Sequence, residues 1–223
     1  MSAPVSLPAE LVVLNYFGDI VFAFSGALVA ARHRMDVLGI VLIGTVTGIG
    51  GGTLRDIILN HPVWWVGNPV ELLLCAGTAL AAYFVKRLPG GTRGLAQWAD
   101  AIGLAAFAVV GAHVAQTDGA SFVVVAFLGM LTATGGGVLR DLLTNTRPMI
   151  LSGELYATAA LLGAAAYTAL SPLMANQTAA AFLAFALCLA VRGASMVFHI
   201  RFGIVGEPLL TMQRRPGGAE SDA

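Results

Sequence analysis

Charged residues inside long apolar segments are the strongest candidates for function in this sequence. Arg55 and Asp56 are adjacent and follow a run of glycines, and Arg140 and Asp141 repeat the arrangement. A charged side chain inside a membrane-spanning helix costs about 2.5–3.5 kcal/mol on insertion scales, so it is retained where it forms an ion pair or borders a path for polar solutes. We expect one of these roles for the polar residues Asn15, Asp19, Arg55, Asp56, Asp100, Arg140 and Asp141.

The predicted depth of these residues in the membrane indicates which of them can meet. Arg140 and Asp100 are expected in the same half of the membrane, so we predict a buried ion pair between them. Arg55 is expected level with Asn15 and Asp19 in the other half, where a related contact is predicted. Neighbouring residues on a helix point about 100° apart, so each arginine need not pair with the aspartate beside it.

The glycine runs before the two Arg–Asp pairs predict distortion of their helices. Each glycine costs a helix roughly 0.8–1 kcal/mol relative to alanine, so three in succession favour a bend or a short unwound segment. Unwound backbone is tolerated in a membrane where it is buried or lines a water-filled cavity, and its carbonyl groups can coordinate cations. The predicted bends are at Gly50, Gly51, Gly52, Gly135, Gly136 and Gly137.

Close helix packing is the alternative explanation for these glycines. Gly44, Gly48 and Gly52 recur at every fourth position, a spacing typical of membrane helices that approach each other closely. The two explanations are compatible, because a helix can pack tightly on one face and bend at its centre.

The two motifs belong to a longer internal duplication. Segments 44–60 and 129–145 are offset by 85 residues and are identical at nine of seventeen positions. The same offset aligns residues upstream, where Phe22 matches Phe107. A fixed offset over such a length indicates two copies of one structural unit.

Composition places the chain in a membrane. Hydrophobic residues make up 57% of the sequence and charged residues 11%, whereas average usage is about 25% charged. The net charge is zero, and no basic run suggests a nucleic-acid partner. Cys75 and Cys188 are isolated, so they predict neither a metal cluster nor a disulfide framework. With no nucleophile beside a base and no phosphate-binding loop, we expect neither an enzyme nor a cofactor.

Seven stretches are long and apolar enough for membrane helices, which need about 20 residues each. They lie at 9–31, 37–59, 69–86, 97–116, 121–144, 151–171 and 179–199. We therefore predict an all-α integral membrane protein of one domain. Its parts are a first repeat at about 9–87, a second at about 97–171, a seventh helix at about 179–199 and a cytoplasmic tail at 200–223. Since each repeat has three spans, the second is inverted relative to the first, as in many transporters with a site near mid-membrane.

All basic residues outside the predicted spans or at the end of one fall on one side of this topology. They are Arg32, Arg34, Lys86, Arg87, Arg93, Arg147, Arg201, Arg214 and Arg215. Lys and Arg accumulate in cytoplasmic loops, so we expect the N-terminus outside and the C-terminus inside the inner (plasma) membrane. Lys86, Arg87 and Arg93 could also contact anionic lipid headgroups.

Two Gly-Gly-Gly-x-Leu-Arg-Asp motifs in inverted three-span repeats, followed by a seventh span, resemble the prokaryotic trimeric intracellular cation (TRIC) channel family. The resemblance covers about residues 10–200. It implies a homotrimer in which each subunit has its own pore for monovalent cations, chiefly potassium. It also implies that the glycine motifs bend the second and fifth helices, which line the pore with the first and fourth. The implied partners are potassium or sodium ions, membrane lipids and further copies of the chain.

Two other functions stay open at this stage. The same domain has been described as a transporter of glycine or another small metabolite, and a membrane scaffold without conduction is the third alternative. Animal TRIC channels carry a Lys-Glu-Val motif tied to phosphoinositide binding, which this chain lacks, so the resemblance does not extend to phosphoinositide control. Half-helix ends at mid-membrane serve ions and substrates alike, so the sequence separates channel from transporter poorly.

Overall fold

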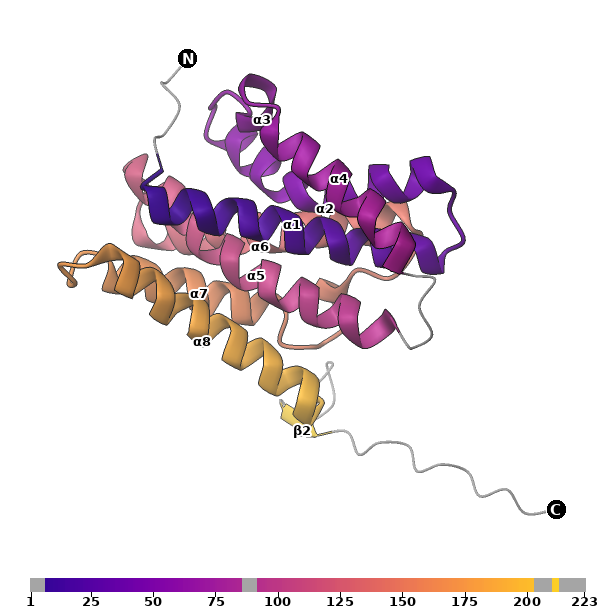
Figure 1. Cartoon of the computed structure of the whole chain (residues 1–223). Coiled ribbons are helices and arrows are strands. Elements are labelled where there is room, and N and C mark those ends of the chain that lie inside the picture. Colours follow the sequence, from indigo (N-terminus) through magenta and orange to yellow (C-terminus); the bar gives the residue numbers. More distant parts are fainter. Residues whose placement is uncertain (1–6, 86–91, 203–209, 213–223) are drawn as a thin grey trace.

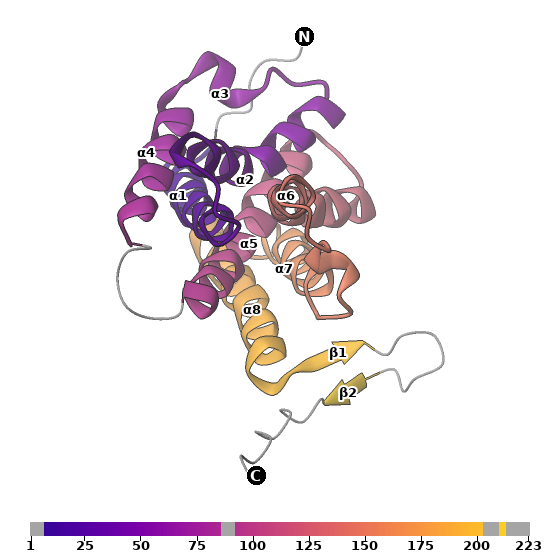
Figure 2. The ribbon, with the colours of Figure 1, turned by 90° about the vertical axis from the view of Figure 1, so that its right-hand side faces the viewer.

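The computed structural model describes residues 7–85, 92–202 and 210–212. The helices in these segments are α1 (Ala9–Arg32), α2 (Val37–Ile58), α3 (Trp64–Gly67), α4 (Val70–Val85), α5 (Thr92–Thr117), α6 (Phe122–Leu143), α7 (Ala157–Leu170) and α8 (Gln177–Phe198). A 3₁₀ turn, η1 (Met149–Leu151), lies between α6 and α7. After α8, two short strands, β1 (Ile200–Phe202) and β2 (Leu210–Met212), pair antiparallel (Figure 2).

The all-α membrane fold predicted from the sequence is confirmed. Within the described segments, five helices are long and apolar enough to cross a membrane (α1, α2, α5, α6 and α8), and α4 and α7 are shorter apolar helices. The largest boundary difference is in the sixth predicted span, 151–171, because η1 and an irregular loop replace its first turns and α7 begins only at Ala157. The predicted tail at 200–223 begins with β1, a strand that the sequence analysis did not expect.

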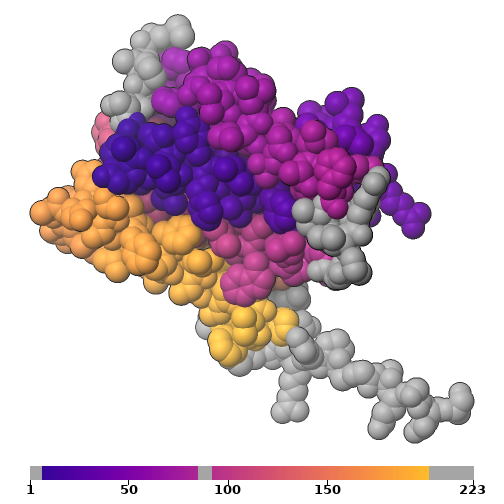
Figure 3. Space-filling view, viewed as in Figure 1, coloured from indigo at the N-terminus to yellow at the C-terminus, as the bar shows by residue number. Residues whose placement is uncertain are grey.

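Four long helices form the centre of the molecule. Both α1 and α6 pack against α2 and against α5, α4 covers α1 and α2, and α7 and α8 cover α5 (Figure 1). Between Ala99 and Ala115 every residue of α5 except Ile102 is buried. Much of one face of the molecule is formed by α1 and α8 (Figure 3). The second repeat is therefore covered more completely than the first, because α8 has no counterpart beside α1.

α2 and α6 end in the same way. Asn60 and Asn145, which follow the two helices, have positive φ angles of 55° and 52°, a left-handed conformation that asparagine tolerates better than most residues. The amide of His61 donates to the carbonyl group of Asp56 at 2.8 Å, and the equivalent bond closes α6 at the same length. These bonds form a Schellman cap, which turns the following loop back over the Arg–Asp pair.

α2 and α6 cross with almost no side chain between them. A Cβ placed on Gly51 would overlap the carbonyl group of Thr132, and a Cβ placed on Gly136 would overlap the carbonyl group of Thr47. The 85-residue offset relates each contact to the other, so the crossing lies on the pseudo-twofold axis of the repeats. Only glycine permits such close approach of the two backbones.

The threonines at the crossing also pack against glycines of the first helix in each repeat. Thr47 lies against Gly26 of α1, and Thr132 lies against Gly111 of α5. Each threonine hydroxyl donates to the carbonyl group four residues earlier in its own helix, at 2.6 and 2.7 Å. The hydroxyls are thereby satisfied within a contact that excludes other side chains.

The unwound segment predicted at the glycine runs is wrong. Helix α2 is continuous from Val37 to Ile58, and α6 is continuous from Phe122 to Leu143. Packing against the partner helix offsets the low helix propensity of glycine, so the backbone hydrogen bonds remain intrahelical. The packing explanation fits the observed contacts, and a bend of the helix axis stays a prediction.

Gly51→Ala should lower the thermal stability of the purified protein. An added methyl group in a well-packed contact typically costs about 1–3 kcal/mol, and here it would meet backbone that cannot rotate away. The measurement is a thermal melt in detergent, with Gly77→Ala as the matched control. A Cβ on Gly77 meets nothing within 4 Å, so that change should preserve the melting temperature or raise it. Equal melting temperatures for both variants would contradict the close contact.

Candidate functional site

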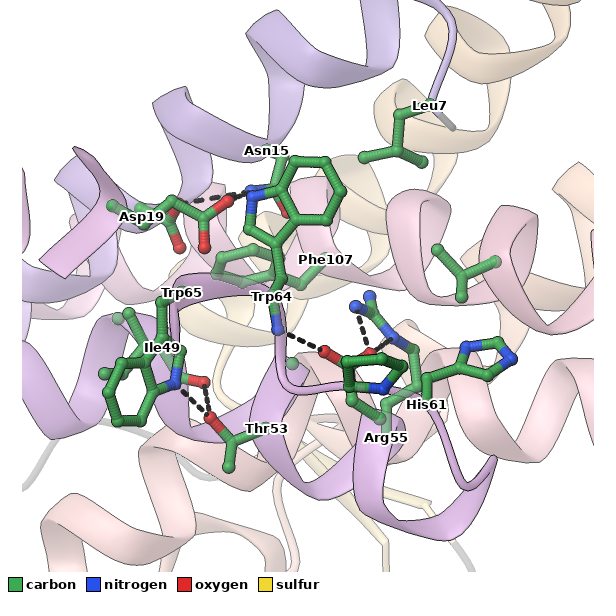
Figure 4. Close-up of a pocket in the computed structure, with 16 residues that line it drawn as sticks. Leu7, Asn15, Asp19, Ile49, Thr53, Arg55, His61, Trp64, Trp65 and Phe107 are labelled. Atoms are coloured by element: carbon green, nitrogen blue, oxygen red, sulfur yellow. Dashed lines mark hydrogen bonds and ion pairs between the residues drawn. The ribbon is translucent and has the colours of Figure 1, made fainter. Parts of the chain in front are cut away.

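The Arg–Asp pair at the end of α2 joins the helix to the loop that follows. Arg55 donates from Nε and Nη2 to Oδ1 of Asp56 at 2.9 and 2.7 Å. The other carboxylate oxygen of Asp56 accepts a hydrogen bond from the amide of Trp64 at 3.2 Å. Figure 4 shows this arrangement beside Asn15 and Asp19. Although neighbouring residues need not pair, the long arginine side chain curls back far enough to reach the adjacent carboxylate.

The second repeat reproduces this motif. Nε of Arg140 donates to Oδ1 of Asp141 at 2.8 Å, and Oδ2 of Asp141 accepts from the amide of Met149 at 3.0 Å. Met149 lies 85 residues after Trp64, so even the amide that caps the aspartate is equivalent in the two repeats.

The structure contains the ion pair predicted between Arg140 and Asp100. Nη1 of Arg140 lies 2.6 Å from Oδ1 of Asp100, and the two side chains are only 2% and 1% exposed. The same Nη1 donates to the hydroxyl of Ser25 at 3.3 Å, and Ser25 donates to the carbonyl group of Ala96 at 2.8 Å. Arg140 therefore connects α6 to α5 and to α1.

The contact predicted between Arg55 and Asn15 or Asp19 is not formed. The hydrogen bonds of Arg55 go to its neighbour, because the residue equivalent to Asp100 is the uncharged Asn15. The amide nitrogen of Asn15 instead donates to Asp19 at 3.2 Å and to Glu71 at 2.6 Å. The two repeats thus differ in how the polar residue of the first helix is used.

Glu71 is a polar residue of this site that the sequence analysis missed. It lies in the first turn of α4 and is 5% exposed. The sequence does contain a signal for it, since Glu71 is the one acidic residue in the apolar stretch 69–86. Its equivalent in the second repeat is Tyr156, whose ring is also buried.

These side chains line two separate pockets. The pocket at Arg55, the Arg55 pocket, contains about 590 Å³ of empty space, including the open solvent at its mouth, and includes Asn15, Asp19, Asp56 and Glu71 in its wall (Figure 4). The pocket at Arg140, the Arg140 pocket, contains about 700 Å³ of empty space on the same measure, and its wall includes Ser25, Arg32, Arg93, Asp100, Asp141 and Arg147. Six residues of its lining lie 85 positions after residues of the Arg55 pocket: Asp100, Arg140, Asp141, Thr146, Arg147 and Met149.

Packed side chains separate the two pockets. Their described linings share no residue. On α1, Phe22 lies between the two linings, and its ring is 5.3 Å from that of Phe107 on α5. With the glycine contact of α2 and α6, this pair closes the centre of the molecule.

Some predicted site residues lie elsewhere. Arg93, expected near lipid headgroups, is exposed and lines the rim of the Arg140 pocket, whereas Lys86 and Arg87 lie outside the described residues. Gly52 and Gly137 flank the two arginines, since a Cβ on either would approach an arginine Nη2 at 3.8 or 3.6 Å. In the described segments no group of three His, Cys, Asp or Glu residues is arranged to hold a metal ion.

The features above define a multi-pass membrane protein with inverted repeats and a polar pocket at each end of its central helices. A family model described as glycine transporter matches the chain twice, at residues 12–87 and 97–172. The chain belongs to this family.

Relatives and solved structures agree on the fold. The chain is 36% identical over 194 residues to the UPF0126 inner membrane protein YadS of Escherichia coli K12. The aligned region covers 84% of this chain and 92% of the relative. A crystal structure of the TRIC channel orthologue from Rhodobacter sphaeroides is 44% identical, with a TM-score of 0.83 over 86% of this chain and 100% of that one. A prokaryotic TRIC channel crystallised in 0.5 M KCl is 34% identical, with a TM-score of 0.79 over 85% of this chain and 96% of that one. The resemblance to prokaryotic TRIC channels is confirmed.

The Arg140–Asp100 pair predicts a non-additive mutant cycle. Removing one partner of a buried ion pair typically costs about 3–5 kcal/mol, because the other charge is left unpaired. Arg140→Ala and Asp100→Asn should each lower the melting temperature, and the double variant should lose less than the sum of the two. Thermal melts of the four proteins test this, and strictly additive shifts would contradict the energetic coupling.

Proposed function

We propose that this protein is a cation channel of the bacterial inner membrane, with one permeation path in each subunit. The observation that carries the proposal is the pair of repeat-related polar pockets, which approach the glycine crossing from opposite ends of the central helices. Carboxylates line both pockets, and a polar path for ions is one of the few reasons to retain such groups within a membrane. The solved structures most similar in sequence among those above are described as TRIC channels, which supports the same class for this chain.

The proposed path is lined by α1, α2, α5 and α6. One half is bordered by Asn15, Asp19, Arg55 and Asp56, and the other half is bordered by Asp100, Arg140 and Asp141. The contacts at Gly51 and Gly136 close the path, so conduction requires α2 and α6 to separate or bend there. Leu139 lies against Gly50 and Leu54 lies against Gly135, so a displacement that connects the pockets would also move these two side chains.

Ion type, assembly and orientation belong to the same proposal. We infer monovalent cations, chiefly potassium, as substrates and three identical subunits, each with its own path. In the seven-span topology that we infer, the N-terminus lies outside, the Arg55 pocket opens to the exterior and the Arg140 pocket opens to the cytoplasm. The excess of Lys and Arg on the latter side supports this orientation.

A secondary transporter of glycine or a similar small zwitterion is the second candidate. The family description names this substrate, and one structural observation favours it. In the described part of the chain, the Tyr156 hydroxyl and Oδ2 of Asp100 are buried without hydrogen-bond partners, near the guanidinium group of Arg140. A carboxylate and a guanidinium group side by side could bind the two charges of an amino acid.

Purified protein in planar bilayers with asymmetric KCl should show unitary current steps that reverse toward the potassium equilibrium potential. The matched assay is glycine uptake into liposomes made from the same preparation. Saturable uptake without current steps would replace the channel with the transporter, and absence of both activities in folded protein would contradict both functions.

A further inference from the structure

The two pockets carry opposite charge. In the Arg55 pocket, Arg55 is the one arginine among the described lining residues, against three carboxylates, those of Asp19, Asp56 and Glu71. In the Arg140 pocket, four arginines in the described lining face two carboxylates. The histidines in both linings do not change this contrast when they are neutral. One end of the proposed path is therefore negative and the other end is positive.

The Arg55 pocket keeps a net negative charge because its arginine is paired with only one of its three carboxylates. Both hydrogen bonds from Arg55 go to one oxygen of Asp56, so these two charges largely cancel. Within the described residues, neither Asp19 nor Glu71 forms a salt bridge. Their partner is the uncharged amide of Asn15, which donates to both. Neither carboxylate is thus in an ion pair, and Arg55 acts on both only from a longer distance.

The difference arose at two positions that contact each other. In the second repeat, the carboxylate is Asp100 on α5 and forms an ion pair with Arg140 at 2.6 Å. In the first repeat, the position equivalent to Asp100 is Asn15, and the carboxylate lies across from it at Glu71 on α4, where the second repeat has Tyr156. The acid of the first repeat is therefore bonded to Asn15 and not to the arginine.

We propose that Glu71, together with Asp19, sets the charge selectivity of the path and makes its conductance asymmetric. This proposal rests on the channel function proposed above. Charges in a cleft with low-dielectric walls focus the field and raise the local concentration of counter-ions. Cations therefore enter more readily from the Arg55 end than from the Arg140 end, where Arg32, Arg93 and Arg147 oppose them.

Single-channel recordings of Glu71→Gln test the proposal. Glutamine keeps the size of the side chain and an oxygen that accepts from Asn15, while it removes the charge. At roughly 10 mM KCl, where the Debye length is about 30 Å, the wild-type channel should rectify, and the variant should lose at least about half of that current asymmetry. Its potassium-to-chloride permeability ratio should fall as well. In 1 M KCl, where the Debye length is about 3 Å, the two proteins should behave alike.

Two further variants make the result specific. Glu10→Gln removes a carboxylate at the same end of α1, from an exposed position outside the pocket lining, and should reduce rectification less than Glu71→Gln does. Arg147→Gln removes an exposed arginine from the opposite pocket and should also reduce rectification. If Glu71→Gln does not fold, Arg147→Gln still tests the charge asymmetry from the opposite pocket.

The outcomes separate this inference from the channel function itself. A wild-type protein without unitary currents would overturn the channel function. A conducting Glu71→Gln channel with wild-type rectification and selectivity at low salt would overturn the role of Glu71. If Glu71→Gln does not fold, unchanged rectification in Arg147→Gln would overturn the proposed charge asymmetry.

Discussion

The backbone contact between α2 and α6 is the constraint on which both pockets depend. Gly51 and Gly136 each precede an arginine by four residues, about 6 Å along a helix. Because the helices are antiparallel at the crossing, Arg55 and Arg140 lie on opposite sides of it. A side chain at either glycine would separate the helices and change the distance from each arginine to its partners. The same contact therefore closes the centre and fixes where the charges lie.

The Arg–Asp pairs then hold the loops and neighbouring helices around that crossing. Each aspartate accepts from its arginine and from a backbone amide beyond the helix cap, so its burial is compensated by several hydrogen bonds. The second repeat has an additional connection, since Arg192 of α8, fully buried, pairs with Glu154 at 2.8 Å and lies over the Tyr156 ring at 5.1 Å. This arrangement ties α8 to the second repeat and contributes to the more complete enclosure of that half.

Much of this architecture could be predicted because it repeats in the sequence. The predicted spans placed Arg140 and Asp100 at the same depth, and a buried arginine requires a carboxylate at its own depth. The helical continuity at the glycines could not be predicted, because propensity describes an isolated helix and the compensating contact at Thr132 comes from another one. Glu71 was missed for a similar reason. Its position at a helix start suggests a solvated end, and only the tertiary fold brings it within 2.6 Å of Asn15.

An inverted duplication with identical halves would present the same field to both sides of a membrane. Any difference between the two directions of permeation must therefore come from positions at which the halves have diverged. Asn15 and Glu71 are such positions, since they contact each other and differ from Asp100 and Tyr156 in charge. The crossing glycines and the Arg–Asp pairs are identical in the two halves and make equivalent contacts there. The residues that create the pockets are thus shared by the repeats, whereas the residues that distinguish the pockets are the ones that the repeats do not share.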